Sequence, residues 1–414
     1  MTLIVQKFGG TSVGDIERLK HVAKIIEQSR QQGKSVVVVV SAMAGVTNQL
    51  ASYIHAAMPV QRYSQTLQES DVILSAGEQV TSGLLSLCLQ ERGIPARSFT
   101  AWQLPFVTDD HHTNANVLTV ECEPLKAFLN QGGVSVVAGF QGIHEGRITT
   151  LGRGGSDMTA VALAHALGAD YCDIYTDVAG VYTADPRLIG DAEKIDTLTF
   201  EEMQLLAEHG AKVLQPKCIA YAFEKNVRLR VLSSFDHYAC GTEIVFAPVQ
   251  RKRDLSGIAH SFNDVKIRLR SLPLTFTHAV RQMCHALTEE GIHYDGFAKD
   301  LTEIDDNKMD ISFLVTKADL VPMLSLLNKQ QKNLGFSEIH VDQNIVKISL
   351  IGQRLKDDFL FRSRILKTLN ERLISAEVAG TMGMKITLTA AENQARQIVQ
   401  LLHDHLIKEK YTSC

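Results

Sequence analysis

Five consecutive valines, Val36–Val40, are the feature that most constrains the fold of this chain. β-Branched side chains favour an extended strand, and a strand that is apolar on both faces belongs in a sheet that is covered on both sides. Two other short apolar runs, Leu3–Phe8 and Val134–Phe140, have the same character. Amphipathic stretches alternate with these runs over residues 1–247, which predicts an α/β sandwich with a largely parallel sheet.

Two glycine-rich loops follow predicted strands and precede predicted helices. The first is Gly9–Gly14 and the second is Gly152–Asp157, where Ser156 or Asp157 can cap a helix of small residues that ends at Gly168. Helix N-termini present unpaired N–H groups and a partial positive charge, and glycine lets an anion approach the backbone closely. The two loops together predict a polyphosphate site.

Neither loop matches a common phosphate-binding motif. Asp15 stands where a Walker A loop has lysine, and the second loop lacks the third glycine of a dinucleotide-binding fingerprint. Gly10–Gly14 fits the G-x-S-x-G elbow of α/β-hydrolases, but too few residues precede it to supply the strands and the oxyanion loop of that fold. For either loop alone, a tight turn without a ligand stays an open alternative.

Composition argues against several other classes of protein. Hydrophobic residues make up 45% of the 414 residues and charged residues 21%, the balance of a globular protein of two or three domains. The seven cysteines are scattered and never spaced C-x-x-C, which argues against a disulfide framework or a zinc site. A net charge of −4 argues against a nucleic-acid partner. Without a signal peptide or a long apolar segment, we expect a cytoplasmic protein that does not bind membranes.

The chain changes character near residue 248. Pro248 and the charged run after it resemble a solvated linker, beyond which the glycine-rich loops cease. A weak internal duplication then aligns Leu287–Ile292 with Leu369–Ile374, and the strand-like Ile311–Val315 with Ile386–Thr389. Each copy has the order strand, helix, strand, strand, helix, which predicts two small α+β modules packed as a pair.

Five segments of the first part, in their order and spacing, resemble the successive signatures of one family, the aspartate kinases. They are Lys7–Ser12, Ser41–Thr47, Ser75–Glu78, Leu151–Asp157 and Thr176–Arg187. The resemblance implies an amino-acid-kinase fold, a three-layer α/β/α sandwich, for residues 1–247, and ACT-type (ferredoxin-like) modules at 255–335 and 340–410. It also implies transfer of the γ-phosphoryl group of ATP to the side-chain carboxylate of L-aspartate, the first step towards lysine, threonine, methionine and diaminopimelate.

This resemblance assigns the catalytic roles to two cations and one acid. Phosphoryl transfer between ATP and a carboxylate brings several negative charges together, so the site needs positive charge and in-line positioning more than a covalent nucleophile. We expect Lys7 and Lys212 to lie along the transferring phosphoryl group, and Asp157 to orient the lysine and the substrate.

The amino-acid substrate has its own requirements. Its α-carboxylate favours a bidentate partner and its ammonium group favours an anion. Arg153 and Glu78 meet these needs, as their family counterparts do, and Ser41, Thr47 and Ser156 are expected to add hydroxyl contacts. A single basic residue is usually a solvated surface charge, so these roles depend on the residues occurring together.

The resemblance also implies a nucleotide side. We expect it to include Thr176, Asp177, Tyr182 and Arg187, with Tyr182 near the base and Arg187 near the phosphates. Other residues expected to contact ATP are Lys7, Phe8, Gly9, Gly10 and Lys212. Mg²⁺ is expected to bridge the phosphates of ATP, and the sequence names no protein ligand for it.

The duplicated half departs from the family pattern. An amino-acid effector is typically held there by an N-I-D-x-I-x-Q-like segment, which here reads His293–Lys299: the acid is kept as Asp295, but Gly296 and Lys299 differ. We therefore expect inhibition by lysine or threonine to be weakened or replaced by another ligand. The alternative is that the modules serve mainly as a dimer interface. Family members also lead us to expect a homodimer or a larger homo-oligomer.

Two competing functions are weighed against this interpretation. A related kinase could act on glutamate, N-acetylglutamate or carbamate, but Arg153 with Glu78 favours a free amino acid, because an acetylated substrate would leave Glu78 unpaired. A catalytically silent amino-acid sensor would be expected to have lost Lys7, Lys212 or Asp157. All three are present.

Overall fold

The computed structural model describes residues 2–58, 66–236, 239–247, 254–272, 276–300, 309–371 and 376–408. The chain forms two compact units. Unit 1 comprises Met1–Val181, Lys194–Glu208 and Lys212–Val249, and unit 2 comprises Tyr182–Glu193, His209–Ala211 and Gln250–Cys414. Two short segments, Tyr182–Glu193 and His209–Ala211, therefore lie between segments of unit 1 in the sequence but belong to unit 2.

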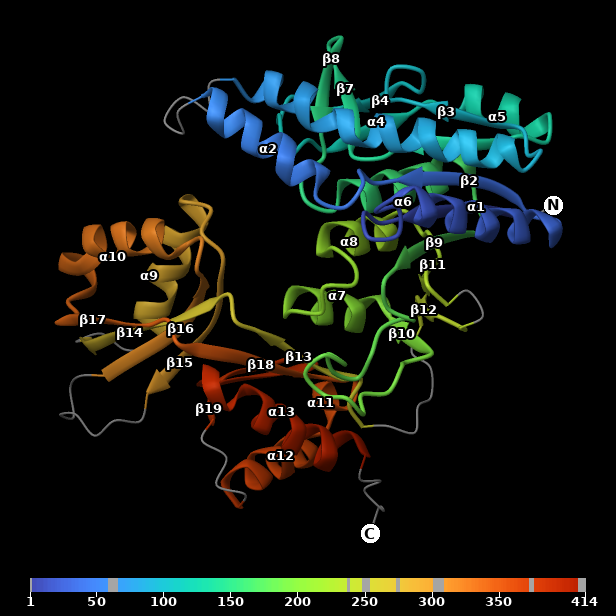
Figure 1. The fold of residues 1–414 in the computed structure, drawn as a ribbon. Coiled ribbons are helices and arrows are strands. Elements are labelled where there is room, and N and C mark those ends of the chain that lie inside the picture. Colours follow the sequence, from blue (N-terminus) through green and yellow to red (C-terminus); the bar gives the residue numbers. More distant parts are fainter. Residues whose placement is uncertain are drawn as a thin grey trace. The chain divides into compact units, whose positions relative to one another are not determined.

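An eight-stranded sheet forms the centre of unit 1, in the order β10-β12-β11-β9-β1-β2-β6-β3 (Figure 1). β1 pairs in parallel with β2 and β9, and β6 pairs in parallel with β2 and β3. Val36–Val40 of β2 are each at most 1% exposed, which confirms the predicted buried, largely parallel sheet. The strands are β1 Leu3–Phe8, β2 Ser35–Val40, β3 Ala96–Phe99, β6 Val134–Ala138, β9 Tyr171–Thr176, β10 Thr197–Thr199, β11 Leu229–Ser233 and β12 Thr242–Val245.

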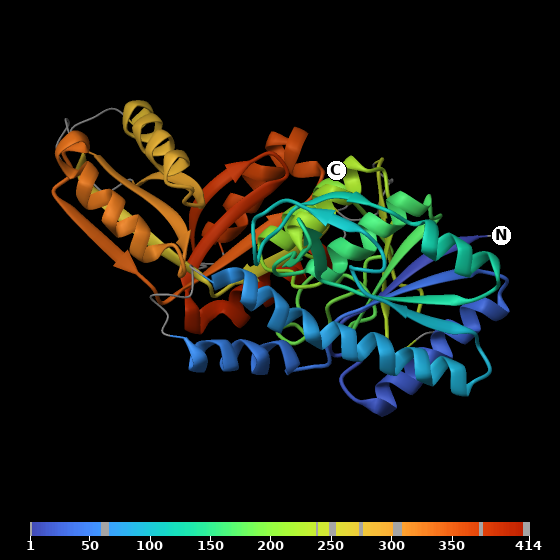
Figure 2. The same cartoon turned by 90° about the horizontal axis from the view of Figure 1, so that it is seen from above.

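Helices cover both faces of this sheet, as Figure 2 shows. α1 and α4 pack together on one face, while α6 lies on the other face against β1, β2 and β9 and contacts α8. The predicted three-layer α/β/α sandwich is thereby confirmed. The helices of unit 1 are α1 Ile16–Gln31, α2 Val46–Ala57, α4 Leu67–Glu91, α5 Glu123–Asn130, α6 Gly155–Leu167, α7 Phe200–Glu208 and α8 Pro216–Glu224.

The long helix α4 also contacts a smaller sheet of the same unit. Its strand order is β5-β4-β7-β8, with β4 Phe106–Thr108, β5 Val117–Val120, β7 Gln141–His144 and β8 Arg147–Thr150. By length and composition alone α4 could cross a bilayer. Leu85 and Leu89 are fully buried in the hydrophobic core, however, which is typical of a core helix in a soluble protein.

The two helices that follow the glycine-rich loops begin differently. Asp15 caps α1, its side chain accepting a hydrogen bond of 2.8 Å from the Arg18 N–H. The N-cap of α6 is Gly154, in the left-handed conformation at φ 76° and without a side-chain cap. The prediction that Ser156 or Asp157 caps this helix is wrong, because both residues lie inside its first turn. The helix ends at Gly168, as predicted.

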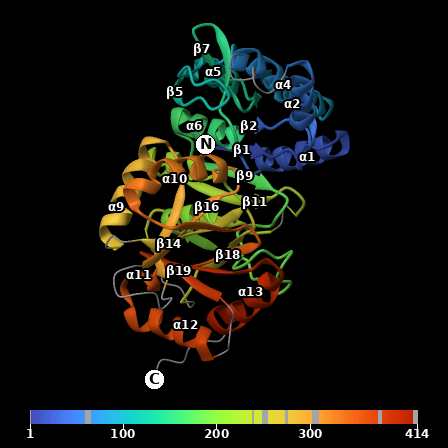
Figure 3. The ribbon, with the colours of Figure 1, turned by 90° about the vertical axis from the view of Figure 1, so that its left-hand side faces the viewer.

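Unit 2 contains two antiparallel four-stranded sheets (Figure 3), which is the architecture expected for two ACT-type modules. One sheet has the order β15-β16-β14-β17 and packs on α9 and α10, and the other has the order β13-β18-β20-β19 and packs on α12 and α13. The strands are β13 Gly257–Ser261, β14 Asp264–Leu272, β15 Tyr294–Asp300, β16 Met309–Thr316, β17 Glu338–Asp342, β18 Ile345–Ile351, β19 Ala376–Met382 and β20 Lys385–Ala391. The helices are α9 Phe276–Glu289, α10 Leu320–Leu334, α11 Arg354–Asp357, α12 Phe359–Glu371 and α13 Ala395–His403.

The strand order of unit 2 differs from the order of the chain. β13 precedes every strand of the β14-containing sheet, yet it pairs with β18 in the other sheet, from Gly257 opposite Ile351 to Ser261 opposite Lys347. One sheet is therefore interrupted in sequence by the whole of the other. The predicted module boundaries at 255–335 and 340–410 stay predictions, but they separate β13 from the sheet that it joins.

Buried charges connect the two sheets of unit 2. The Lys347 ammonium lies 2.7 Å from a carboxylate oxygen of Asp264 and 3.6 Å from one of Asp295, and the Lys385 ammonium lies 2.8 Å from Asp295. Lys385 also lies 3.0 Å from Nε2 of His209. Burial and the nearby ammonium groups lower the pKa of His209 to about 3, so this imidazole is neutral at physiological pH. The cluster thus balances two cations against two carboxylates.

Candidate active site

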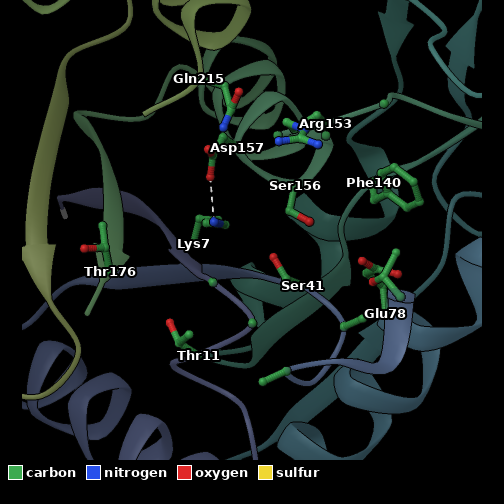
Figure 4. A pocket seen from close by; sticks show the side chains of 18 of the residues that line it. Lys7, Thr11, Ser41, Glu78, Phe140, Arg153, Ser156, Asp157, Thr176 and Gln215 are labelled. Carbon is green, nitrogen blue, oxygen red and sulfur yellow. Dashed lines mark ion pairs between the residues drawn. The ribbon is translucent and has the colours of Figure 1, made fainter. Parts of the chain in front are cut away.

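A pocket of about 820 Å³ opens in unit 1 where β1, β2 and β9 end. Its walls come from the loops after β1 and β2, from α4, from the loop before α6, and from the segment around Lys212. The carboxyl ends of parallel strands are where α/β sheets commonly bind ligands, because the backbone diverges into loops there. Figure 4 shows the side chains that line it.

An ion pair lies in the middle of the pocket. Lys7 comes from β1 and Asp157 from the first turn of α6, and the Lys7 ammonium lies 2.6 Å from a carboxylate oxygen of Asp157. Their side chains are only 12% and 8% exposed. A charge that is little exposed needs a partner, and a second anion entering the pocket would compete with Asp157 for the same ammonium group.

The loop before α6 gives the pocket a wall that can accept anions. Gly152 and Gly154 have φ of 73° and 76°, a conformation that glycine adopts easily. A Cβ at Gly154 would lie 2.1 Å from Cγ of Gln215, and one at Gly152 would lie 2.8 Å from Oδ1 of Asn114. Because glycine occupies both positions, the N-terminal end of α6 lines the pocket directly, with its partial positive charge.

Glu78 supplies a buried acid to the pocket. The residue is 3% exposed, and burial raises the pKa of its carboxyl group to about 7, while a hydrogen bond from the backbone of Ala42 opposes the rise. Its Oε2 has no hydrogen-bond partner among the described residues. A buried acceptor that lacks a hydrogen-bond partner favours a ligand that brings a donor, above all a cationic one.

The pocket brings together most of the residues that the sequence predicted. Those lining it are Lys7, Gly9, Gly10, Ser41, Thr47, Glu78, Arg153, Ser156, Asp157, Thr176 and Lys212. In Figure 4, Glu78 and Phe140 lie towards one side, Thr176 towards the other, and the Lys7–Asp157 pair between them. The division of these residues into an amino-acid side and a nucleotide side stays a prediction.

Four predicted nucleotide contacts do not line the pocket. Phe8 is fully buried and stacks on Tyr175 with ring centroids 4.5 Å apart, so it supports the sheet. Asp177 is exposed just beyond β9. Tyr182 and Arg187 belong to unit 2, where Arg187 pairs with Asp185 at 2.8 Å. Their nucleotide roles stay predictions.

Several pocket residues were not predicted, and two of them have an unusual backbone conformation. Thr113 and Phe140 line the pocket, and both are non-glycine residues with positive φ, of 67° and 71°. Such backbone conformations are strained and often occur at functional sites. No pattern in the sequence distinguishes these two residues, because the strain is imposed by contacts from distant segments.

The chain is similar to known proteins over most of its length. A sequence model of the amino acid kinase family matches residues 2–233. The aspartokinase of Pseudomonas aeruginosa is 41% identical over 409 residues, 97% of each chain, and an aspartate kinase of Pseudomonas fluorescens is 40% identical over 407 residues, also 97% of each. The crystal structure of E. coli aspartokinase III in complex with aspartate and ADP has a TM-score of 0.79 and 26% identity, and covers 98% of this chain and 99% of its own. The same enzyme with lysine and aspartate has a TM-score of 0.73.

Proposed function

The chain belongs to the amino acid kinase family, as one of its aspartate kinases, and on that premise we propose which residues carry each part of the reaction. The enzyme transfers the γ-phosphoryl group of ATP to the side-chain carboxylate of L-aspartate. A carboxylate oxygen bonds to the γ-phosphorus while the bond from that phosphorus to the bridging oxygen breaks, releasing ADP and 4-phospho-L-aspartate. The observation that carries the residue assignment is the Lys7–Asp157 pair, which lies in one pocket with Glu78 and Thr176.

We propose that Lys7 and Lys212 stabilise the charge on the transferring phosphoryl group, with the N-terminal end of α6 as a third source of positive potential. Asp157 holds the Lys7 ammonium in place at 2.6 Å. The described residues contain no group of three acids, histidines or cysteines that could hold a metal ion. Mg²⁺ would accordingly be held mainly by the phosphates of ATP and by water, as is usual for this ion, and would neutralise phosphate charge.

For L-aspartate, we propose that Arg153 binds the α-carboxylate and Glu78 the α-ammonium group. The unpartnered Oε2 of Glu78 supports this role, because an ammonium group would supply the missing donor. Ser41, Thr47 and Ser156 are short hydroxyl residues of the same pocket that suit a small polar substrate. An N-acetylated amino acid would leave Glu78 without a cation, which disfavours it as substrate.

Trapping of the acyl phosphate with hydroxylamine tests this function. We expect purified protein with Mg-ATP to form hydroxamate with L-aspartate, and at least 100-fold less, by kcat/KM, with glutamate or N-acetylglutamate, because a hydrogen-bonded site rejects poorly matched acids strongly. Product from glutamate or its acetyl derivative would mean that the fold is as described but the substrate is a different acid. Absence of product with every acid would favour a silent amino-acid sensor.

We also propose that inhibition by lysine or threonine is weakened, or that another ligand takes their place. E. coli aspartokinase III has been solved with lysine. What supports a difference here is Asp295, whose carboxylate already lies 2.8 Å from the Lys385 ammonium and 3.6 Å from that of Lys347. An amino-acid effector would have to displace an internal cation to reach it. The departures from the family pattern are Gly296 and Lys299, and the side chain of Lys299 lies outside the described residues.

The effector proposal has a direct kinetic test. Lysine and threonine, added singly and together at millimolar concentrations, are expected to change the rate of hydroxamate formation from aspartate by less than twofold, because Asp295 is already neutralised. Clear inhibition at those concentrations would contradict the proposal. Asp295→Asn frees Lys385 from its partner and serves as a comparison variant.

The assembly and location of the protein also stay proposals. We propose a homodimer or a larger homo-oligomer, as the resemblance to aspartate kinases implies, and a cytoplasmic protein, as the composition implies. The mass of the purified protein in solution, measured by light scattering, tests the first of these.

A further inference from the structure

A buried acid lies next to the pocket wall that we propose to bind the amino acid. Asp71 lies on α4, seven residues before Glu78 and therefore on the same face of the helix. It is 0% exposed and does not line the pocket. A fully buried carboxylate is costly unless several donors satisfy it, so its partners identify what it serves.

Three donors converge on Asp71 from two segments. Its Oδ1 accepts a hydrogen bond of 2.5 Å from the hydroxyl of Thr150, and both oxygens lie 3.1–3.2 Å from the backbone nitrogen of Thr113. Its Oδ2 lies 2.6 Å from Nδ1 of His112. Thr113 and Thr150 both line the pocket, whereas Asp71 is hidden behind them. The acid thus fixes two residues of the pocket wall.

The backbone conformation of Thr113 explains why its hydrogen bonds to Asp71 are needed. Its φ of 67° is unusual for a β-branched residue, and a strained conformation persists only where surrounding contacts hold it. The two bonds from its N–H to Asp71 are contacts of that kind. Without the carboxylate, Thr113 would lose both of these bonds, and His112 would lose its contact with Asp71.

Thr113 and Thr150 in turn bound the loop that carries Arg153. Thr150 ends β8 and leads directly into Leu151–Gly152–Arg153. A Cβ at Gly152 would lie only 3.1 Å from the carbonyl oxygen of Thr113, so that loop packs closely against the 112–114 segment. Thr150 also accepts, through its carbonyl oxygen, a bond of 2.9 Å from the N–H of Ala115. A shift of either segment would displace Arg153.

We propose that Asp71 is a positioning residue for L-aspartate binding, acting through Thr113 and Thr150 on the loop that carries Arg153. The proposal rests on the role of Arg153 given under the proposed function. Asp71 touches neither substrate, so its removal should change the affinity for the amino acid more than it changes turnover or the affinity for ATP.

Two neighbouring threonines of β8 provide a matched test. Thr150→Val removes the hydroxyl that bonds Asp71, while Thr149→Val makes the same change at an equally buried residue whose hydroxyl bonds Thr108 at 2.7 Å and which does not line the pocket. We expect Thr150→Val to raise the KM for aspartate about tenfold, the order expected for one hydrogen bond to a charged group, with kcat and the KM for ATP within about threefold. Thr149→Val should leave all three near the parent values, and Thr150→Ser should restore them.

Asp71→Asn and Arg153→Ala, singly and together, complete the test. Asp71→Asn is expected to raise the KM for aspartate tenfold or more, and this effect should largely disappear in the Arg153→Ala background, where no guanidinium remains to be positioned. If Asp71→Asn does not fold, the effect of Thr150→Val on the KM for aspartate is measured in the parent protein and in the Arg153→Ala variant instead, and this comparison tests the proposal. Equal effects of the two valine variants, a change in the KM for ATP instead, or an undiminished effect without Arg153 would overturn the proposal. Failure of the parent protein to use aspartate would overturn the proposed function instead.

Discussion

Replacing Lys7 by alanine is expected to lower kcat by a factor on the order of 10³ while the folded state is retained. Removal of one preorganised charge from a phosphoryl-transfer site commonly costs that much. The expected effect has two parts. The substitution removes the cation that we propose to lie along the phosphoryl group, and it leaves the Asp157 carboxylate, which lies 2.6 Å from the Lys7 ammonium in the parent protein, as an uncompensated negative charge. Hydroxamate formation from aspartate measures kcat, and a thermal melt measures stability.

Two comparison variants separate these parts. Lys7→Ala combined with Asp157→Asn removes both charges, and it should be less impaired than the sum of the single variants if Asp157 acts mainly through Lys7. Lys20→Ala breaks an exposed pair with Glu17 on α1 and should leave kcat unchanged, because a solvated surface pair contributes little. A Lys7→Ala enzyme with near-normal kcat would remove Lys7 from the catalytic residues.

The second large effect is a dependence of aspartate use on pH. Burial raises the pKa of Glu78 to about 7, and in the role proposed for Glu78 only its ionised form pairs with the substrate ammonium group. The ionised fraction is therefore nearly complete above pH 8 and falls about tenfold per pH unit well below 7. At saturating Mg-ATP, kcat/KM for aspartate is expected to fall about 30-fold between pH 8.5 and pH 5.5, with the loss appearing mainly in KM.

Glu78→Gln is the control for this profile. The amide keeps the shape of the side chain but neither titrates nor carries charge, so kcat/KM for aspartate should be lower by a factor on the order of 10² at pH 8.5 and nearly flat down to pH 5.5. The titration of ATP affects both enzymes equally, so the difference between their two pH profiles does not contain it. A glutamine variant with the same steep profile would assign the pH dependence to another group.

The sequence was sufficient for those parts of the fold that local patterns dictate. The valine run predicts a buried central strand because no other environment suits it, and the glycine-rich loops predict where the backbone must approach a ligand. Family resemblance then selected Lys7, Glu78, Arg153 and Asp157 out of many charged residues, and these four line one pocket.

What the sequence could not provide depends on contacts between distant segments. Nothing near Asp71 indicates that its partners are Thr113 and Thr150, since the three residues meet only when α4, a loop and β8 pack together. The start of α6 was mispredicted for a related reason. Ser156 is a good capping residue, but the N-cap is Gly154 instead, in a left-handed conformation and at a place where a side chain would collide with Gln215.

The order of strands in unit 2 has a consequence for synthesis of the protein. β13 leaves the ribosome before any strand of the β14-containing sheet, but its partner β18 is translated only after that sheet is complete. During this interval Ile258 and Ala259, which are buried in the finished sheet, belong to a strand without a neighbour. An unpaired apolar strand is a template for pairing with other chains. Slow translation or premature termination between β14 and β18 would therefore leave a nascent chain prone to aggregation, although the strands of unit 1 had already been made.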